Sequence, residues 1–217
     1  MKDLLNKEIK LAAHPLAWLF IAFGVMAMIP GYPILVGNFF VCLGIFQSFQ
    51  KSRENNDILY TALLPVKKAD VVSAKFTFVC LIQMLSFALM AVITLVRMTV
   101  FKDGAVYVNN AMMNANQAYL GYALIVFALF NLLFVKGFFK TAYKFTKPFV
   151  SFIAAAFIVV GITETLHHIP GLQFLNDTDT MNNPVQWGIL AVCAVIYAVV
   201  TISSKNASQR YFEEVDL

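Results

Sequence analysis

The sequence is poor in charged residues. Only 13% of its 217 residues are Asp, Glu, Lys or Arg, and 60% are hydrophobic. Soluble domains carry about 25% charged residues, so the composition excludes a soluble globular domain and indicates an integral membrane protein. The net charge of +4 is small and the basic residues are dispersed along the chain, which argues against nucleic-acid binding.

Motifs that carry enzymatic chemistry are missing as well. The chain holds no G-x-x-x-x-G-K-[ST] loop for nucleotide phosphates, no H-E-x-x-H zinc motif and no G-x-S-x-G nucleophile motif. Its three cysteines, Cys42, Cys80 and Cys193, all fall inside apolar runs and provide no disulfide framework. We therefore expect no catalytic residue, no metal and no cofactor in this chain itself.

Long apolar runs are what the sequence has in abundance. A membrane-spanning helix needs about 17–25 mostly apolar residues, and six runs approach or reach this length. The first two are short and are joined by a Pro- and Gly-rich turn, so a re-entrant hairpin is an alternative for this pair. We predict an all-α membrane protein with a single transmembrane domain over residues 1–217. The six predicted spans are Pro15–Ile29, Pro33–Phe46, Phe76–Met98, Ala118–Val135, Phe149–Leu166 and Val185–Ser203.

Positive charge is distributed unevenly between the segments that connect these spans. Of the 16 Lys and Arg residues, only Arg97 and Lys102 fall in segments on the side opposite to the termini. Cytoplasmic segments of membrane proteins are enriched in Lys and Arg. The asymmetry therefore predicts that both termini lie in the cytoplasm, and it fits six spans better than five or seven.

Residues 1–14, before the first predicted span, have an amphipathic pattern. We predict a helix that lies at the cytoplasmic interface of the membrane, with a frayed basic lead-in to the first span as the alternative. Its apolar face would hold Leu4, Leu5, Ile9 and Ala12, and its basic face Lys2, Lys7 and Lys10.

Few polar groups interrupt the predicted spans. Uncharged polar side chains inside a membrane usually bond between helices, and a contact with substrate is the alternative. Glu164 is the only acid inside a predicted span, and His167 follows it at the spacing of half of a di-iron site. One such pair does not complete a metal site, so we favour a solvated helix end or an outer vestibule. The weak candidates for substrate binding are Asn38, Gln83, Asn131 and Glu164.

The segment Glu54–Lys75 is polar and basic, yet it lies between two strongly apolar runs. Its apolar positions 58, 59, 62 and 63 suit two turns of an amphipathic helix, with Asp57 as the N-cap and Pro65 as the break. Asp70 can then start the helix that continues into the third span. A short cytoplasmic helix of this kind either anchors the chain to anionic lipid or transmits the movement of a partner to the spans.

The run ENNDILYTALLPVKKADVVSAK, with IPGYPILVG before it, closely resembles bacterial ABC permeases of the second exporter type. It is most similar to the small six-span permeases of Firmicutes, the group that includes the exporter of phenol-soluble modulins. In that family the loop between the second and third spans forms a coupling helix, which docks in a groove of a separate ATP-binding subunit. The resemblance is specific over residues 29–75 and assigns no cargo.

The resemblance implies that residues 48–75 form a cytoplasmic coupling loop in a bacterial cell membrane. It implies two permease chains, expected to be a homodimer, and two ATP-binding subunits that bind ATP and Mg²⁺. It further implies ATP-driven export of an amphipathic or lipophilic cargo. Phe-rich faces of the second, third and fifth spans would suit a cytolytic or antimicrobial peptide. The implied contacts with the ATP-binding subunit are Asp57, Leu59, Tyr60, Leu63, Leu64, Pro65, Val66, Lys67 and Lys68.

A self-contained secondary transporter or channel, driven by an ion gradient, is the alternative function. Such proteins usually carry a chain of acids or histidines through the membrane and often show inverted repeats. The sequence has neither pattern, so we favour the permease of an ATP-driven exporter.

Overall fold

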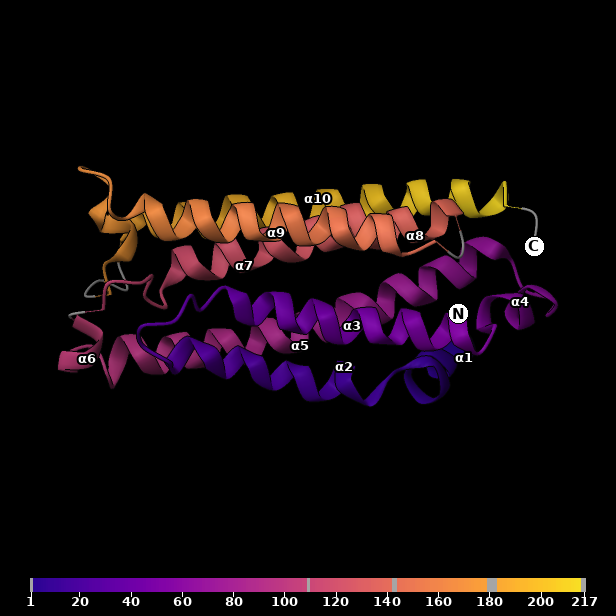
Figure 1. The fold of residues 1–217 in the computed structure, drawn as a ribbon, viewed down its shortest axis with the longest axis horizontal. Coiled ribbons are helices and arrows are strands. Elements are labelled where there is room, and N and C mark those ends of the chain that lie inside the picture. The colour runs from indigo at the N-terminus through magenta and orange to yellow at the C-terminus, as the bar shows by residue number, and fades with distance from the viewer. Residues whose placement is uncertain (1, 109, 142–143, 179–182, 216–217) are drawn as a thin grey trace.

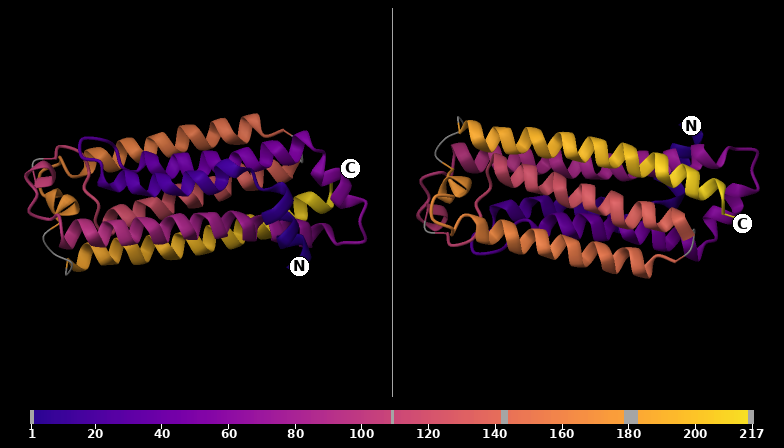
Figure 2. Two further views of the ribbon diagram at one scale, coloured as in Figure 1. Left: turned by 90° about the horizontal axis from the view of Figure 1, so that it is seen from below. Right: turned by 90° about the horizontal axis from the view of Figure 1, so that it is seen from above.

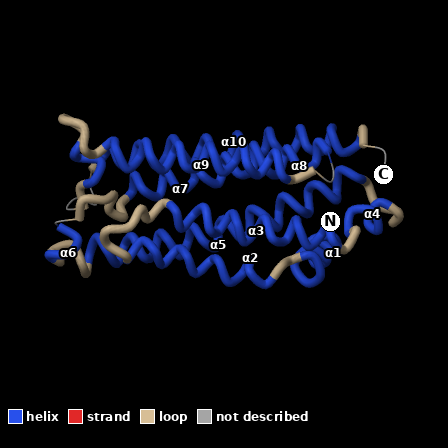
Figure 3. The backbone as a smooth tube through the Cα atoms, viewed as in Figure 1, coloured by secondary structure: helices blue, strands red, loops and turns tan. Residues whose placement is uncertain are grey.

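The computed structural model describes residues 2–108, 110–141, 144–178 and 183–215. All regular secondary structure in these residues is helical (Figure 3), so the predicted all-α class is confirmed. The helices are α1 (Lys2–Lys7), the π-helix η1 (Glu8–Ala12), α2 (Pro15–Leu19), the 3-10 helix η2 (Phe20–Met28), α3 (Val36–Glu54), α4 (Asp57–Ala62), α5 (Lys68–Thr99), α6 (Ala105–Val108), α7 (Gln117–Leu129), the π-helix η3 (Phe130–Val135), α8 (Lys136–Thr141), α9 (Thr146–Leu166), the 3-10 helix η4 (Gln173–Asn176) and α10 (Pro184–Glu213).

The long helices lie lengthwise in an elongated bundle (Figure 1). One end, called here the α4 end, carries α4, the start of α1 and the end of α10; α6 lies at the opposite end, called the α6 end (Figure 2). The segments that are rich in Lys and Arg meet at the α4 end. The charge asymmetry of the sequence thus corresponds to the two ends of the bundle.

Four helical runs are long and apolar enough to cross a membrane: α5, the run from α7 through η3 to α8, α9, and α10. The segments Lys2–Ala12 and Pro15–Met28, which meet at an angle of 95°, make a fifth candidate if they count as one broken span. The helix α3 does not qualify, because its last turns are polar. By length and composition the described residues therefore do not reach the six predicted spans, although α3 runs alongside the others (Figure 1).

The bend between the N-terminal segment and α2 has a local cause. Proline disfavours the helical conformation in the residue before it, and His14, which precedes Pro15, is extended with ψ of 141°. His14 also caps α2, because its Nδ1 accepts a hydrogen bond of 3.1 Å from the backbone N–H of Leu16. The N-terminal helix consequently turns away from the axis of α2.

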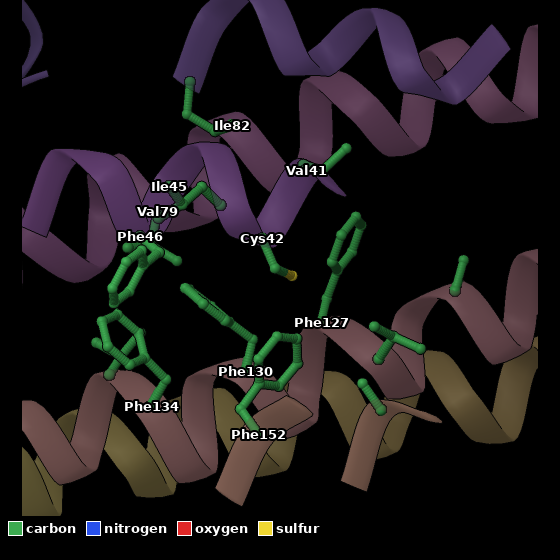
Figure 4. Close-up of a cluster of buried hydrophobic side chains, with 14 of the residues drawn as sticks. Val41, Cys42, Ile45, Phe46, Val79, Ile82, Phe127, Phe130, Phe134 and Phe152 are labelled. Carbon is green, nitrogen blue, oxygen red and sulfur yellow. The ribbon is translucent and has the colours of Figure 1, made fainter. Parts of the chain in front are cut away.

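Phenylalanine rings fill the interior of the bundle. Figure 4 shows rings of α7 and η3 directed towards α3, and the Phe46 and Phe149 centroids lie only 3.9 Å apart. Close aromatic packing of this kind stabilises a core. Many rings of the Phe-rich faces are buried in the chain itself, and the suitability of those faces for cargo stays a prediction. The buried rings from α3, α5 and α9 are Phe46, Phe49, Phe76, Phe78 and Phe152.

Candidate functional site

The short helix α4 begins after a residue in the left-handed conformation. Asn56 has φ of 51° and makes no capping hydrogen bond with its side chain; asparagine adopts this conformation more readily than most residues. The prediction that Asp57 is the N-cap is therefore wrong. Its carboxylate is paired with Lys7 instead, at 2.8 Å between Oδ1 and Nζ. The helix ends at Ala62, earlier than predicted.

One side of α4 faces the bundle and the other side is open. Ile58 and Thr61 are buried, whereas Leu63 is 83% exposed and Tyr60 is 69% exposed. Of the predicted apolar positions, 58 is thus buried and 59 and 63 are exposed, whereas the side chain at position 62 lies outside the described part of the structure. Clustered exposed apolar residues mark a surface for a partner or for lipid. We call this patch the coupling surface, after the coupling helix that the family resemblance implies; it comprises Leu59, Tyr60, Leu63, Leu64 and Pro65.

The other predicted contact residues are placed differently. Lys67 is exposed beside the coupling surface. Val66 packs against the hydrophobic core. The Lys68 Nζ donates a hydrogen bond of 2.7 Å to the backbone carbonyl of Val215, which ties the start of α5 to the residues after α10. Of the implied contacts, Val66, Lys68 and the ion-paired Asp57 therefore take part in internal packing.

Behind α4 lies a cluster of four charges. The Lys75 Nζ is 2.6 Å from Glu8 Oε2, and both side chains are 2% exposed. The Lys7 Nζ lies 3.3 Å from Glu8 Oε1 and 2.8 Å from Asp57 Oδ1. Two positive and two negative groups balance one another, which a buried site requires. We call Lys7, Glu8, Asp57 and Lys75 the charge cluster.

Two hydroxyl groups complete the hydrogen bonding of the charge cluster. Lys75 donates to Ser52 Oγ at 2.8 Å, and Lys7 donates to Thr61 Oγ1 at 2.8 Å. The cluster therefore joins the N-terminal segment, α3, α4 and α5. A buried charge that loses its partner costs several kcal/mol, so these four elements cannot separate easily. One set of ion pairs and hydrogen bonds thereby connects α4 to α5.

The N-terminal segment is also fastened directly to α3. The Lys51 Nζ donates to the Ala13 carbonyl at 3.1 Å, and the His14 N–H donates to Ser48 Oγ at 2.9 Å. Lys7 does not project from a basic outer face, as the amphipathic pattern predicts, because its ammonium group turns towards Glu8 and Asp57. The sequence-based placement of Lys7 is therefore wrong.

A groove of about 460 Å³ separates α1 from the segment after α4. Asp3, Leu4 and Lys7 line one side, and residues 64–67 with Asp70 line the other. The groove adjoins the coupling surface, because Leu64 and Pro65 belong to both.

Sequence reasoning did not identify Glu8, Ser52 or Lys75 as site residues. Glu8 and Lys75 are 67 positions apart, and no local pattern pairs them. The available signal was weak: Glu8 is an acid within a lysine-rich segment, and Lys75 stands immediately before a long apolar run.

The two amides predicted in the third and fourth spans bond to each other. The Gln83 Nε2 donates to Asn131 Oδ1 at 3.0 Å, and the Asn131 Nδ2 donates to Gln83 Oε1 at 3.1 Å. The Tyr197 hydroxyl donates to Gln83 Oε1 at 2.8 Å, and Asn131 also donates to Thr201 Oγ1 at 2.9 Å. These bonds connect α5, η3 and α10, in agreement with the bonding of amides between membrane helices. A contact of either amide with substrate stays a prediction.

We expect Asn131→Leu to lower the free energy of unfolding by about 1 kcal/mol, because it leaves part of the buried Gln83 amide without a partner. Denaturant unfolding in detergent measures the effect. The double variant with Gln83→Leu should be less destabilised than the sum of the two single variants. Strict additivity would show that the two amides do not stabilise each other.

The remaining substrate candidates lie apart from this pair. The Asn38 Nδ2 lies 3.5 Å from Met90 Sδ, between α3 and α5. At the α6 end, Glu164 Oε2 accepts a hydrogen bond of 2.9 Å from the Met113 N–H. Among the described residues, no group of three or more His, Cys, Asp or Glu side chains could hold a metal ion. The roles of Asn38 and Glu164 in substrate binding stay predictions.

Comparison with known proteins identifies the family. The model of the family described as "ABC-2 family transporter protein" matches residues 3–213, which is nearly the whole chain. A comparison with curated proteins gives no significant match, and a comparison with solved structures gives none either. Membership implies a transport component that resides in the membrane and works with an ATP-binding partner. The chain belongs to the ABC-2 family of transporters, as a multi-pass membrane permease.

Proposed function

We propose that this chain is the permease subunit of an ATP-driven exporter and that a separate polypeptide binds the ATP. The coupling surface is the observation that carries this proposal. It presents Leu59, Tyr60, Leu63 and Leu64 at the α4 end, and apolar patches that protrude into water usually receive a partner. The chain has no phosphate-binding loop of its own, so the energy of ATP must reach it through such a contact.

The α4 end faces the cytoplasm in this proposal. The positive-inside rule supports this orientation, because the segments that are rich in Lys and Arg meet at this end. Both termini are then cytoplasmic, and the coupling surface is on the side of the membrane where ATP is available. A partner can approach the coupling surface and the groove beside α1 together.

The charge cluster supplies a route for the movement. The working unit comprises two copies of this permease and two ATP-binding subunits, which hold ATP and Mg²⁺. When the ATP-binding subunits close, they displace α4, and the cluster transmits this displacement through Lys75 to α5 and through Glu8 to the N-terminal segment. The long helices then shift and release an amphipathic or lipophilic cargo, for which a cytolytic or antimicrobial peptide is our candidate.

We expect Leu63→Asp to weaken the complex with the ATP-binding subunit at least tenfold and to abolish the stimulation of its ATPase activity. The substitution places a carboxylate in an apolar contact, where its desolvation is unfavourable. Co-purification after co-expression with the ATP-binding subunit, followed by an ATPase assay, measures both effects.

The matched control is Val106→Asp, which changes an exposed apolar residue at the α6 end. This variant should bind the partner and stimulate it like the original chain. If the Leu63→Asp chain co-purifies with the ATP-binding subunit and stimulates its ATPase activity normally, the coupling surface is not the docking site.

A further inference from the structure

The α6 end contains a pocket of about 900 Å³ that the proposed coupling mechanism does not use. Three separate segments form its walls, with Tyr107 and Asn114 from the first, His167 and His168 from the end of α9, and residues 173–178 from the third. Small-molecule sites typically measure about 300–1,000 Å³. The pocket is therefore large enough to admit a ligand or a side chain of a peptide.

The amide groups in the wall are already engaged by the protein. Asn176 Oδ1 accepts a hydrogen bond of 2.6 Å from the Asn114 N–H, and Asn176 Nδ2 donates to the Met112 carbonyl at 3.4 Å. The buried Arg97 donates to Asn114 Oδ1 at 2.8 Å, and its guanidinium carbon lies 3.9 Å from the centroid of the Tyr107 ring. These contacts shape the pocket, and they leave these amides little capacity for a ligand.

His167 differs from the amides because one of its nitrogens has no partner among the described residues. The ring is 8% exposed, and its Nε2 lies 3.2 Å from the Ala111 carbonyl. A carbonyl only accepts, so Nε2 carries a proton, and Nδ1 of the neutral ring is then a hydrogen-bond acceptor. This Nδ1 is buried and unpartnered. Buried polar atoms without a partner are uncommon, which points to a group that the pocket receives.

The groups around His167 add further acceptor capacity. His168 is exposed, and its ring centroid lies 4.1 Å from that of His167. The exposed Asp103 carboxylate contributes negative charge at the rim, whereas Lys102 already has a partner. The unpartnered Nδ1 of His167 and the exposed Asp103 carboxylate are therefore two acceptors that the pocket lining offers.

We propose that this pocket binds a primary amine in its ammonium form, with an N–H donated to His167 Nδ1. An ammonium group has three donors and no acceptor, so it complements the acceptors His167 Nδ1 and Asp103. Asp103 lies where it attracts the positive charge. Polyamines and lysine side chains of peptides both carry this group. The site is separate from the coupling surface and does not depend on the proposed function.

Binding to the purified full-length chain in detergent tests the proposal by isothermal titration calorimetry. The probes are spermidine, trilysine, and trilysine acetylated at every amine as the neutral control. We expect saturable binding of spermidine or trilysine and at least tenfold weaker binding of the acetylated peptide. Binding of spermidine alone identifies a small polyamine site, and binding of trilysine alone identifies a peptide site; both support recognition of an ammonium group. No saturable binding, or equal binding of the acetylated peptide, would overturn it.

Variants of His167 locate the site. His167→Phe keeps a ring but removes the acceptor, so it should weaken amine binding at least tenfold. His167→Asn offers an oxygen near the position of Nδ1 and should restore affinity to within about threefold of the original chain. Ile169→Ala, at an exposed residue near His167 outside the pocket, is the matched control and should bind normally.

Thermal unfolding in detergent establishes that each variant is folded. If a variant does not fold, the comparison of the three probes on the original chain still tests the proposal. Unchanged binding by a folded His167→Phe chain would overturn it. Co-purification with the ATP-binding subunit is measured in parallel and should be unaffected by His167→Phe. Failure of the amine-binding proposal is therefore distinguishable from failure of the proposed function.

Discussion

Replacement of Glu8 by glutamine is expected to lower the free energy of unfolding by about 3 kcal/mol, which is the lower end of the range for breaking a buried ion pair. The Lys75 ammonium loses the carboxylate at 2.6 Å, and its remaining partners are Ser52 Oγ at 2.8 Å and Asp57 Oδ2 at 4.0 Å. The charge cluster would then hold two positive groups and one negative group. The uncompensated charge, and not the lost hydrogen bond alone, causes most of the effect.

A double-mutant cycle with Lys75→Met separates this effect from general damage to the fold. Each single variant leaves one charge of the pair uncompensated, whereas the double variant Glu8→Gln/Lys75→Met restores the balance between Lys7 and Asp57. Denaturant unfolding in detergent should therefore show a double variant that is at least about 1 kcal/mol more stable than additivity predicts. If the two effects simply add, the cluster does not act as a unit.

The same substitution also tests the transmission route of the proposed function. A folded complex that contains Glu8→Gln should keep the ATP-binding subunit, because the coupling surface is intact, but it should show reduced stimulation of ATP hydrolysis. Lys10→Gln is the matched control, because Lys10 is exposed on the same N-terminal segment. If the Glu8→Gln complex stimulates ATP hydrolysis normally, the charge cluster does not transmit the movement. The proposal that the partner docks at the coupling surface would be unaffected.

Replacement of Gly44 by leucine should be similarly destabilising, by about 3 kcal/mol, the upper part of the usual range for overpacking. A Cβ at position 44 would lie 2.8 Å from the Leu16 carbonyl oxygen and 2.9 Å from Phe20 Cβ. The nearer contact is a backbone atom, which cannot move aside as a flexible side chain can. The helices α2 and α3 would have to separate, with loss of packing along η2.

Thermal unfolding in detergent measures the effect of Gly44→Leu. Gly161→Leu is the matched control, because a Cβ on Gly161, in the long helix α9, meets no other atom within 4 Å. That variant should unfold close to the original temperature. Equal stability of the two variants would show that α2 and α3 do not pack through Gly44. The smaller variant Gly44→Ala should already be destabilised, because the Cβ itself makes the clash.

Several parts of the fold were predictable because they depend on local physical chemistry. The apolar run in α5 and the long run from α7 to α8 are recognisable from hydropathy alone, and Pro15 with His14 encodes the bend before α2. The short helix α4 follows from the amphipathic pattern after Asn56. The pattern does not predict which side of α4 is buried, because apolar residues lie on both sides of the helix. Only the neighbouring helices decide which side they cover.

The α4 end of the molecule illustrates the limit of the sequence more clearly. Asp57 is a reasonable N-cap by its position, yet it pairs with Lys7, which the amphipathic pattern places on an outer face. Local rules predict the preferred conformation and the exposed face of each segment by itself. Once the segments meet, electrostatic interactions between distant residues decide which side chains pair. The same reason explains why Gln83 and Asn131, predicted separately as substrate candidates, bond to each other.

The sequence by itself determined that the protein is helical and resides in a membrane, that positive charge gathers at one end, and that a short polar segment interrupts the spans near that end. These properties depend on composition and on neighbouring residues, which hydropathy and charge report directly. Only the tertiary structure decided which apolar residues of that segment stay exposed, that Glu8 and Lys75 pair behind it, and that His167 lines a pocket at the other end. Such arrangements depend on contacts between residues far apart in the chain, and no local pattern contains them.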